Sequence, residues 1–242
     1  MQCVLDETTI LVNGERLVLD AAGALFWPAE STLVFADIHF EKGSSYAERG
    51  VFLPPYDTRT MLRRIRATLA HRKPKRVIAL GDSFHDRRAA DRLDDSERRA
   101  LREFSEQTEW IWVAGNHDPI PPTWLGGSIA PEVEIAGLMF RHEPSPGPTA
   151  GEIAGHLHPC KTVTRRGRGL RLRCFVSDGY RLLLPAFGAY AGGLDVGDEA
   201  IASLFNGDCL AYVLGTRRVY AVATTKTSHR LWKKSTSDFA AQ

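Results

Sequence analysis

The sequence predicts an α/β (α+β) protein that folds as a single domain over residues 1–242, with two β layers. In the first half, short apolar runs alternate with a stretch of helical periodicity. In the second half, short strand-like runs follow one another through glycine-containing turns. The composition agrees with this, because 43% hydrophobic and 25% charged residues are ordinary for a globular protein and argue against disorder.

The first half is predicted to contain a β-hairpin and then parallel βαβ units. Residues 10–19 hold two apolar runs around Asn13-Gly14, a pair typical of a tight hairpin turn, although Glu15-Arg16 leave a longer loop open. Apolar positions at helical spacing predict a helix over 57–71, and Asp94-Asp95-Ser96 offer caps for another. Buried strands are expected at 32–36, 77–80 and 110–114.

The second half is predicted to be mostly β. Asp178-Gly179 and Gly215-Thr216 are typical turn sequences between strands. One short helix is expected near 198–205. The expected strands are 133–142, 161–164, 170–177, 180–184, 209–214 and 218–224.

Several classes of protein are disfavoured. No apolar run approaches the roughly 20 residues that span a bilayer, so no membrane partner is expected. The first six residues lack the features of a signal peptide. The four cysteines lie far apart without a C-x-x-C pair, which argues against a disulfide framework or zinc knuckle and favours a cytoplasmic location.

Potential metal ligands follow the expected strands. Asp37 and His39, then Asp82, then Asn116 and His117 each come directly after an apolar run. The carboxyl ends of parallel strands meet at one edge of a sheet, so these side chains should converge. His142 and the Gly155-His156-Leu157-His158 segment add further imidazoles. Any one of these motifs alone is more typical of a surface turn; the ordered set predicts a metal site.

This ordered set resembles that of the calcineurin-like metallophosphoesterase superfamily, over residues 32–158. The runs 35–43, 81–86 and 184–190 are similar to those of one branch, the ligase-associated DNA damage response endonucleases. The resemblance implies a four-layer αββα sandwich of two mixed sheets. In much of the superfamily a further Asp stands where this chain has His85, which leaves His85 either a hydrogen-bond partner of the site or a packing residue.

The resemblance also implies two divalent metal ions. Asp37, His39, Asp82 and His158 would hold one. Asp82, Asn116, His142 and His156 would hold the other, with Asp82 bridging. A mixture of carboxylate, amide and imidazole ligands suits Mn, Fe or Zn, of which Mn²⁺ is expected here. Two such ions clamp a phosphoryl group and activate water.

His117 is then the expected general acid for the leaving oxygen, with structural support of its turn as the alternative. Asp118 either orients that imidazole or caps the following turn. The short interval between Gly115 and His142 leaves little room for a large cap over the site and favours an open groove.

Positive charge is concentrated in two segments. Residues 161–173 and 216–234 each hold six Lys or Arg and no acid, so the +2 total is the sum of +12 in these segments and −10 elsewhere. A basic face beside a phosphoester site suits a nucleic-acid backbone, and Tyr180, Tyr220 and Trp232 would stack on bases if exposed. The alternative is a strand edge whose charges prevent aggregation. The candidate contacts are Arg165, Arg166, Arg168, Arg171 and Arg173.

The predicted function is therefore a Mn²⁺-dependent dinuclear phosphodiesterase, and the branch resemblance implies a DNA endonuclease of the DNA damage response. DNA is the expected partner, bound without sequence preference, with single strands as one candidate form. A homodimer is left open, and DNA ligase, helicase or exonuclease partners are implied by the resemblance only. The alternatives are a hydrolase of small phosphodiesters or phosphomonoesters such as cyclic nucleotides, and a non-catalytic scaffold.

Overall fold

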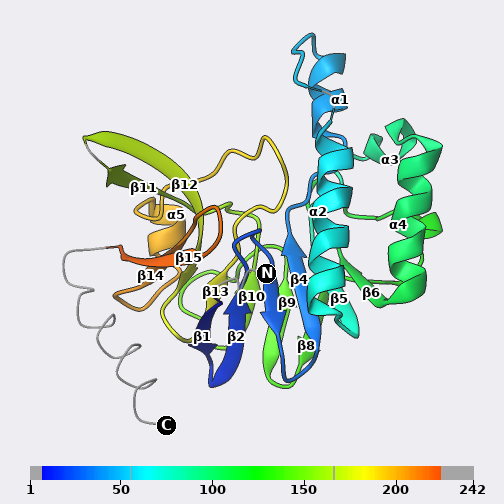
Figure 1. Ribbon diagram of the computed structural model, residues 1–242. Coiled ribbons are helices and arrows are strands. Elements are labelled where there is room, and N and C mark those ends of the chain that lie inside the picture. Colours follow the sequence, from blue (N-terminus) through cyan, green and yellow to red (C-terminus); the bar gives the residue numbers. More distant parts are fainter. Residues whose placement is uncertain (1–6, 55, 166, 225–242) are drawn as a thin grey trace, which may run out of the picture.

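The computed structural model describes residues 7–54, 56–165 and 167–224, which form two facing β-sheets with helices outside them (Figure 1). The helices are α1 (Lys42–Glu48), α2 (Asp57–Arg72), α3 (Ala89–Arg92), α4 (Asp95–Gln107), the 3₁₀ helix η1 (Thr123–Leu125) and α5 (Glu199–Ala202). The strands are β1 (Thr8–Val12), β2 (Glu15–Leu19), β3 (Leu25–Trp27), β4 (Thr32–Ala36), β5 (Arg76–Leu80), β6 (Glu109–Val113), β7 (Ser128–Ala130), β8 (Glu132–Ile135), β9 (Leu138–Arg141), β10 (Glu152–Ala154), β11 (Cys160–Arg165), β12 (Arg168–Ser177), β13 (Leu182–Leu183), β14 (Leu210–Leu214) and β15 (Val219–Ala223).

The first sheet has the strand order β1-β2-β3-β4-β5-β6-β7. The predicted hairpin is confirmed: Val12 pairs with Glu15, so only Asn13 and Gly14 form the turn, both with positive φ as a type I′ turn requires. Strands β4, β5, β6 and β7 are parallel, which confirms the expected βαβ units. The carboxyl ends of β4, β5 and β6 consequently lie next to one another.

The second sheet has the order β15-β14-β12-β13-β10-β9-β8 and is also mixed. Its centre is parallel, because β10 pairs in parallel with both β13 and β9, and antiparallel strands flank this centre. Strand β11 pairs only with β12, and this hairpin extends away from the body of the protein (Figure 1).

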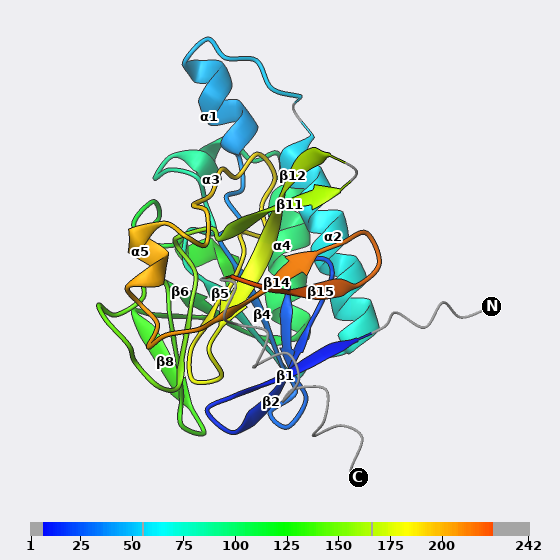
Figure 2. The ribbon, with the colours of Figure 1, turned by 90° about the vertical axis from the view of Figure 1, so that its left-hand side faces the viewer.

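Three apolar clusters separate the layers. The largest lies between the sheets and includes Val34, Ile78, Phe140, Phe175 and Tyr212. The second packs the outer face of the first sheet against α2 and α4, and the third packs the outer face of the second sheet against α5. Figure 2 shows α5 in front of the second sheet, with α2 and α4 on the far side. The four-layer order is confirmed, although the helix on the second sheet has only four residues.

Some predicted boundaries are wrong. The expected strand 133–142 is two strands, because Ala136 and Gly137 take positive φ and turn the chain between β8 and β9. The strand expected at 180–184 is shorter, because only Leu182–Leu183 (β13) are paired. The helix expected near 198–205 is also shorter and consists of Glu199–Ala202 (α5). Strands β3, β7 and β10 and helix α1 were not predicted. Among the described residues, no helix has both the length and the apolar character needed to cross a membrane.

Candidate metal centre

The first group of predicted ligands comes from two sheets. Asp37 and His39 follow β4, and His158 follows β10 by four residues. The Nε2 atoms of His39 and His158 lie 3.2 Å apart, and His158 Nε2 lies 3.2 Å from Asp37 Oδ1. All three side chains therefore turn their ligand atoms toward one point.

The second group is arranged in the same way. Asp82 follows β5, Asn116 follows β6, and His142 and His156 follow β9 and β10. His142 Nε2 lies 2.9 Å from Asn116 Oδ1, 3.4 Å from Asp82 Oδ2 and 3.2 Å from His156 Nδ1. The structure thus brings all seven predicted ligands together in two adjacent groups.

Backbone hydrogen bonds tie the two groups to each other. Both carboxylate oxygens of Asp37 accept from the N–H of His156, at 3.2 and 3.0 Å. Asp82 Oδ1 accepts from the N–H of His117 at 2.9 Å, and the Asp82 carbonyl accepts from the N–H of His39. Each carboxylate keeps lone pairs toward the site while it holds a neighbouring segment in place.

The backbone at the site is strained. Five of the ligand residues have φ between 45° and 69°, which costs a non-glycine residue roughly 1–3 kcal/mol. They are Asp37, His39, Asp82, His156 and His158. Glycine is required where ligands pass close by, since a Cβ on Gly115 would lie 2.2 Å from Asp82 Oδ1 and one on Gly155 would lie 2.5 Å from Asp37 Oδ2. Glycine therefore precedes Asn116 and His156 because a larger residue would collide with the carboxylates of Asp82 and Asp37.

The environment sets the charge of these groups. Burial lowers the pKa of His39 to about 2, and His158 and Lys42 act in the same direction. Burial would raise the pKa of Asp82, but the hydrogen bond and charge of His142 outweigh it and lower that pKa to about 2. Burial would lower the pKa of His142, but the hydrogen bond to Asp82 and the charges of Asp37 and Asp82 outweigh it and raise that pKa to about 9. Metal ions bind neutral imidazole and ionised carboxylate, so His142 has to lose a proton when a metal ion binds.

These donor sets fit divalent metal ions. Ligand atoms about 2.1 Å from a metal lie about 3 Å from each other, which is the spacing found within each group. His142 Nδ1 lies 3.2 Å from the carbonyl of Leu80 and donates to it in the tautomer that leaves Nε2 free for a metal. In the part of the chain that the structure describes, buried His39 Nδ1 has no hydrogen-bond partner, so the tautomer of His39 is not fixed in the way that the tautomer of His142 is.

His117 lies at the rim of this centre, and its side chain is 41% exposed. Its Nδ1 lies 2.8 Å from the carbonyl of His85, and its Nε2 lies 3.9 Å from Asp82 Oδ2. The His85 ring stacks on the His117 ring at a centroid distance of 5.3 Å. His85, which the sequence left unassigned, therefore orients His117 with both its carbonyl and its ring.

Asp118 has a different role from the imidazole-orienting one considered from the sequence. Its Oδ2 accepts from the N–H of Phe84 at 3.0 Å, and His117 is oriented by His85 instead. Burial raises the pKa of Asp118 to about 7. Asp118 thus fixes the loop after β5 against the loop after β6.

Lys42 is a residue of the site that the sequence analysis missed. It begins α1 and is only 7% exposed. Burial lowers its pKa, and the charges of Asp37 and Asp82 oppose this. The one feature of the sequence that could have assigned Lys42 to the site is its place in the 35–43 run, three residues after His39.

Two arginines hold the segment 186–188 against the metal ligands. Arg173 Nη1 donates to the carbonyl of Ala186 at 2.6 Å and lies 3.3 and 3.4 Å from those of Phe187 and Gly188. Arg64 Nη1 donates to the Phe187 carbonyl at 2.9 Å. The N–H groups of Phe187 and Gly188 in turn donate to the carbonyls of Ala36 and Asp37.

The guanidinium of Arg173 is therefore used within the protein, and its contact with nucleic acid stays a prediction. Arg168 and Arg171 are exposed on β12, and Arg171 donates to the carbonyl of Gly193. Arg165 lies in β11, but its side chain and Arg166 lie outside the described residues, as does Trp232.

The aromatic candidates do not extend the site. Tyr180 is 64% exposed, but its carbonyl accepts from Gly151 at the amino end of β10, whereas His156 follows the carboxyl end. Tyr220 is 48% exposed on β15, the edge strand of the second sheet, and the guanidinium carbon of Arg218 lies 5.0 Å from its ring centroid.

The two sheets and the two ligand groups at their edge define a metal-dependent phosphoesterase. The chain belongs to the calcineurin-like phosphoesterase family, whose model matches residues 31–234.

Among solved structures, the chain is similar to the nuclease MPE of Pseudomonas putida, with 31% identity and a TM-score of 0.73 over 90% of this chain and 100% of that one. It also matches Yfce, a phosphoesterase from E. coli, with 14% identity and a TM-score of 0.39 over 80% of this chain and 99% of that one. No curated protein sequence matches the chain.

Proposed function

We propose that the protein is a Mn²⁺-dependent endonuclease that cleaves DNA in the DNA damage response. The observation that carries the proposal is the pair of adjacent ligand groups with His117 exposed beside them. The similarity to a solved bacterial nuclease over 100% of that chain supports DNA as the substrate.

Seven residues would hold two metal ions in this proposal. Asp37, His39 and His158 would bind one ion, Asn116, His142 and His156 would bind the other, and Asp82 would contribute to both. Carboxylate, amide oxygen and imidazole donors together favour Mn²⁺ over Mg²⁺ or Ca²⁺. When bound, the two ions supply Lewis acidity to the phosphoryl oxygens and lower the pKa of a water molecule.

His117 moves the proton that the leaving oxygen needs. With Nδ1 donating to the His85 carbonyl, the proton to be transferred is carried by Nε2, the nitrogen nearer the site. A sugar alkoxide is a poor leaving group, so general-acid catalysis at this atom matters most for DNA. The stacked His85 ring, whose pKa burial lowers to about 4, stays neutral and adds no competing charge.

DNA contacts in this proposal come from exposed cations around the centre. Arg168 and Arg171 project from the β11–β12 hairpin, which extends beyond the second sheet (Figure 1). Contacts to phosphates position a strand without reading its sequence, so cleavage is expected to be independent of sequence.

The experiment that tests the proposal uses purified protein, Mn²⁺ and circular single-stranded DNA. Conversion of circles to linear strands would demonstrate an endonuclease, and a chelator should abolish it. Inertness on DNA together with Mn²⁺-dependent hydrolysis of a small chromogenic diester would refute the DNA proposal and favour a small-phosphodiester hydrolase. A parallel reaction with the Asp82→Ala variant controls for contaminating nuclease, because this variant lacks the bridging carboxylate.

A further inference from the structure

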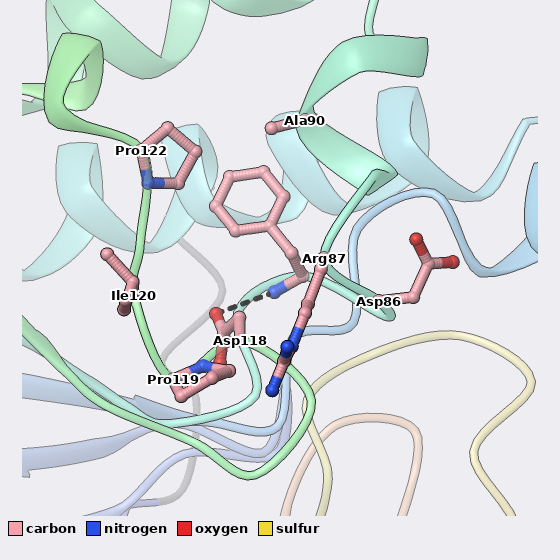
Figure 3. Close-up of a pocket in the computed structure, with 8 residues that line it drawn as sticks. Asp86, Arg87, Ala90, Asp118, Pro119, Ile120 and Pro122 are labelled. Carbon is pink, nitrogen blue, oxygen red and sulfur yellow. Dashed lines mark hydrogen bonds between the residues drawn. The ribbon is translucent and has the colours of Figure 1, made fainter.

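A separate pocket opens beside His117. It has a volume of about 240 Å³ (Figure 3). Its residues are Phe84, Asp86, Arg87, Ala90, Asp118, Pro119, Ile120 and Pro122, and we call it the Phe84 pocket. Phe84 lies two residues after Asp82, and Asp118 directly follows His117, so the pocket adjoins the metal centre on the side of the proposed general acid.

The walls of the Phe84 pocket are apolar and rigid. Phe84 and Ala90 are buried, and Ile120 is 82% exposed, so its side chain is accessible to a bound group. Pro119 and Pro122 flank Ile120 in the lining, and their fixed φ angles limit movement of this wall. The pocket is smaller than the roughly 300–1,000 Å³ of sites for drug-sized ligands, so it suits a single flat ring system.

Among the described residues around the pocket, one cation has no ion pair. Asp86 is neutralised by Arg92, at 2.7 Å, and Asp118 accepts the N–H of Phe84. The exposed side chain of Arg87 runs beside Asp118 and Pro119 (Figure 3), and no ion pair of Arg87 occurs among the described residues. Its neighbour Arg88 is instead paired with Glu48 at 2.8 Å. An apolar slot with an unpaired guanidinium at its edge complements a group that is flat, apolar on its faces and attached to an anion.

We propose that the Phe84 pocket binds the nucleobase on the leaving-group side of the cleaved bond, while Arg87 contacts the neighbouring phosphate. The inference rests on the proposed nuclease function and adds to it a subsite. A base that packs against Ile120 and the prolines fixes the sugar whose oxygen His117 protonates. The subsite therefore increases cleavage of strands with an intact base at that position, without discriminating among sequences.

The test is cleavage of an end-labelled single-stranded oligonucleotide in which one abasic tetrahydrofuran residue is moved through the sequence. A sequencing gel then gives the cleavage rate of each bond. Because stacking of one base contributes strongly to single-strand binding, the bond whose leaving side is abasic should be cut about 10-fold more slowly by the unmodified protein. In Ile120→Ala and Ala90→Leu, which remove one wall and fill the pocket respectively, this factor should fall to about one-fold.

Arg88→Gln is the matched control, because Arg88 carries the same charge one position away and does not line the pocket. It should retain the 10-fold factor, whereas Arg87→Gln should lower cleavage of intact and abasic strands alike. Equal cleavage of abasic and intact positions by the unmodified protein would overturn the subsite while leaving the nuclease proposal intact. So would an unchanged factor in both Ile120→Ala and Ala90→Leu, as expected if the pocket receives a protein side chain. Absence of any cleavage with Mn²⁺ would overturn the nuclease function itself, and the subsite with it.

Discussion

Replacing Arg173 by Met separates its structural contacts from the DNA contact that its position in a basic segment predicts. Methionine retains much of the apolar stem but removes the donors that reach the carbonyls of segment 186–188. A buried acceptor that loses its donor costs about 1–3 kcal/mol. Only the Ala186 bond is short, and Phe187 keeps its bond from Arg64, so the free energy of unfolding should fall by about 1–3 kcal/mol.

For a chain of this length, each kcal/mol lowers Tm by about 2–4 °C, so the Arg173→Met variant should melt about 2–12 °C lower. Metal affinity should also fall, because segment 186–188 donates to the backbone of Ala36 and Asp37 and so positions the first ligand. Differential scanning calorimetry and metal titration of the purified variant measure the two effects.

Arg171→Met is the control, since this exposed side chain lies two residues away on the same strand, where it donates to the Gly193 carbonyl and interacts with the Cys160 thiol. It should change the free energy of unfolding by less than about 1 kcal/mol and weaken DNA binding in a salt-dependent way. The reasoning is refuted if Arg173→Met retains the original Tm but weakens DNA binding more than Arg171→Met does.

Three further changes test the centre itself. Asp82→Ala should abolish hydrolysis and reduce the bound metal, measured by inductively coupled plasma mass spectrometry; a fully active variant would contradict the bridging role. His117→Ala should slow DNA cleavage about 10²–10⁴-fold but hardly affect a diester with a 4-nitrophenolate leaving group; equal losses on both would contradict a proton-donor role. Asp118 has a pKa raised to about 7, so the folded state binds more protons than the unfolded state between about pH 4 and 7, and stability falls as pH rises through that window. We therefore compare the free energies of unfolding of the unmodified protein and Asp118→Asn, both metal-free, by urea denaturation at pH 5 and pH 8. The value for the variant minus that for the unmodified protein should be larger at pH 8 than at pH 5, by about 4 kcal/mol at most. Identical pH profiles of the two proteins would contradict the raised pKa of the buried carboxyl.

The ligand set could be predicted because each member is placed by a simple rule. Apolar runs mark β4, β5 and β6, parallel strands end at the same edge, and Asp37, Asp82 and Asn116 are the first polar side chains beyond those ends. The Asn13-Gly14 hairpin followed equally directly, since these two residues tolerate the positive φ of its turn.

Other features depend on contacts that no local pattern carries. Helix α1 begins at Lys42, and the Gly43 and Ser44 that follow do not favour helix on their own. The helix is held from outside, where Asp57 accepts the Gly43 N–H at 2.8 Å. Strand β10 has three residues and owes its existence to neighbours on both sides. The alternation along β12 correctly placed Arg171 and Arg173 on one face, but which of them meets protein and which meets solvent depends on the distant segment 186–188.

The carboxylates of Asp37 and Asp82 have two roles at the centre: they are potential metal ligands, and they accept backbone N–H groups of neighbouring segments. Left-handed backbone at five ligands would be unstable if metal ions alone held them, because the strain would be released once the ions departed. Asp37 and Asp82 instead accept N–H groups from the segments that carry His156 and His117, and these bonds involve no metal. Charge-assisted bonds of this kind contribute roughly 1.5–3 kcal/mol each, enough to offset the strain of one residue apiece. These bonds therefore hold the segments of His156 and His117 beside the two carboxylates without a metal ion, and they offset the strain of two of the five residues.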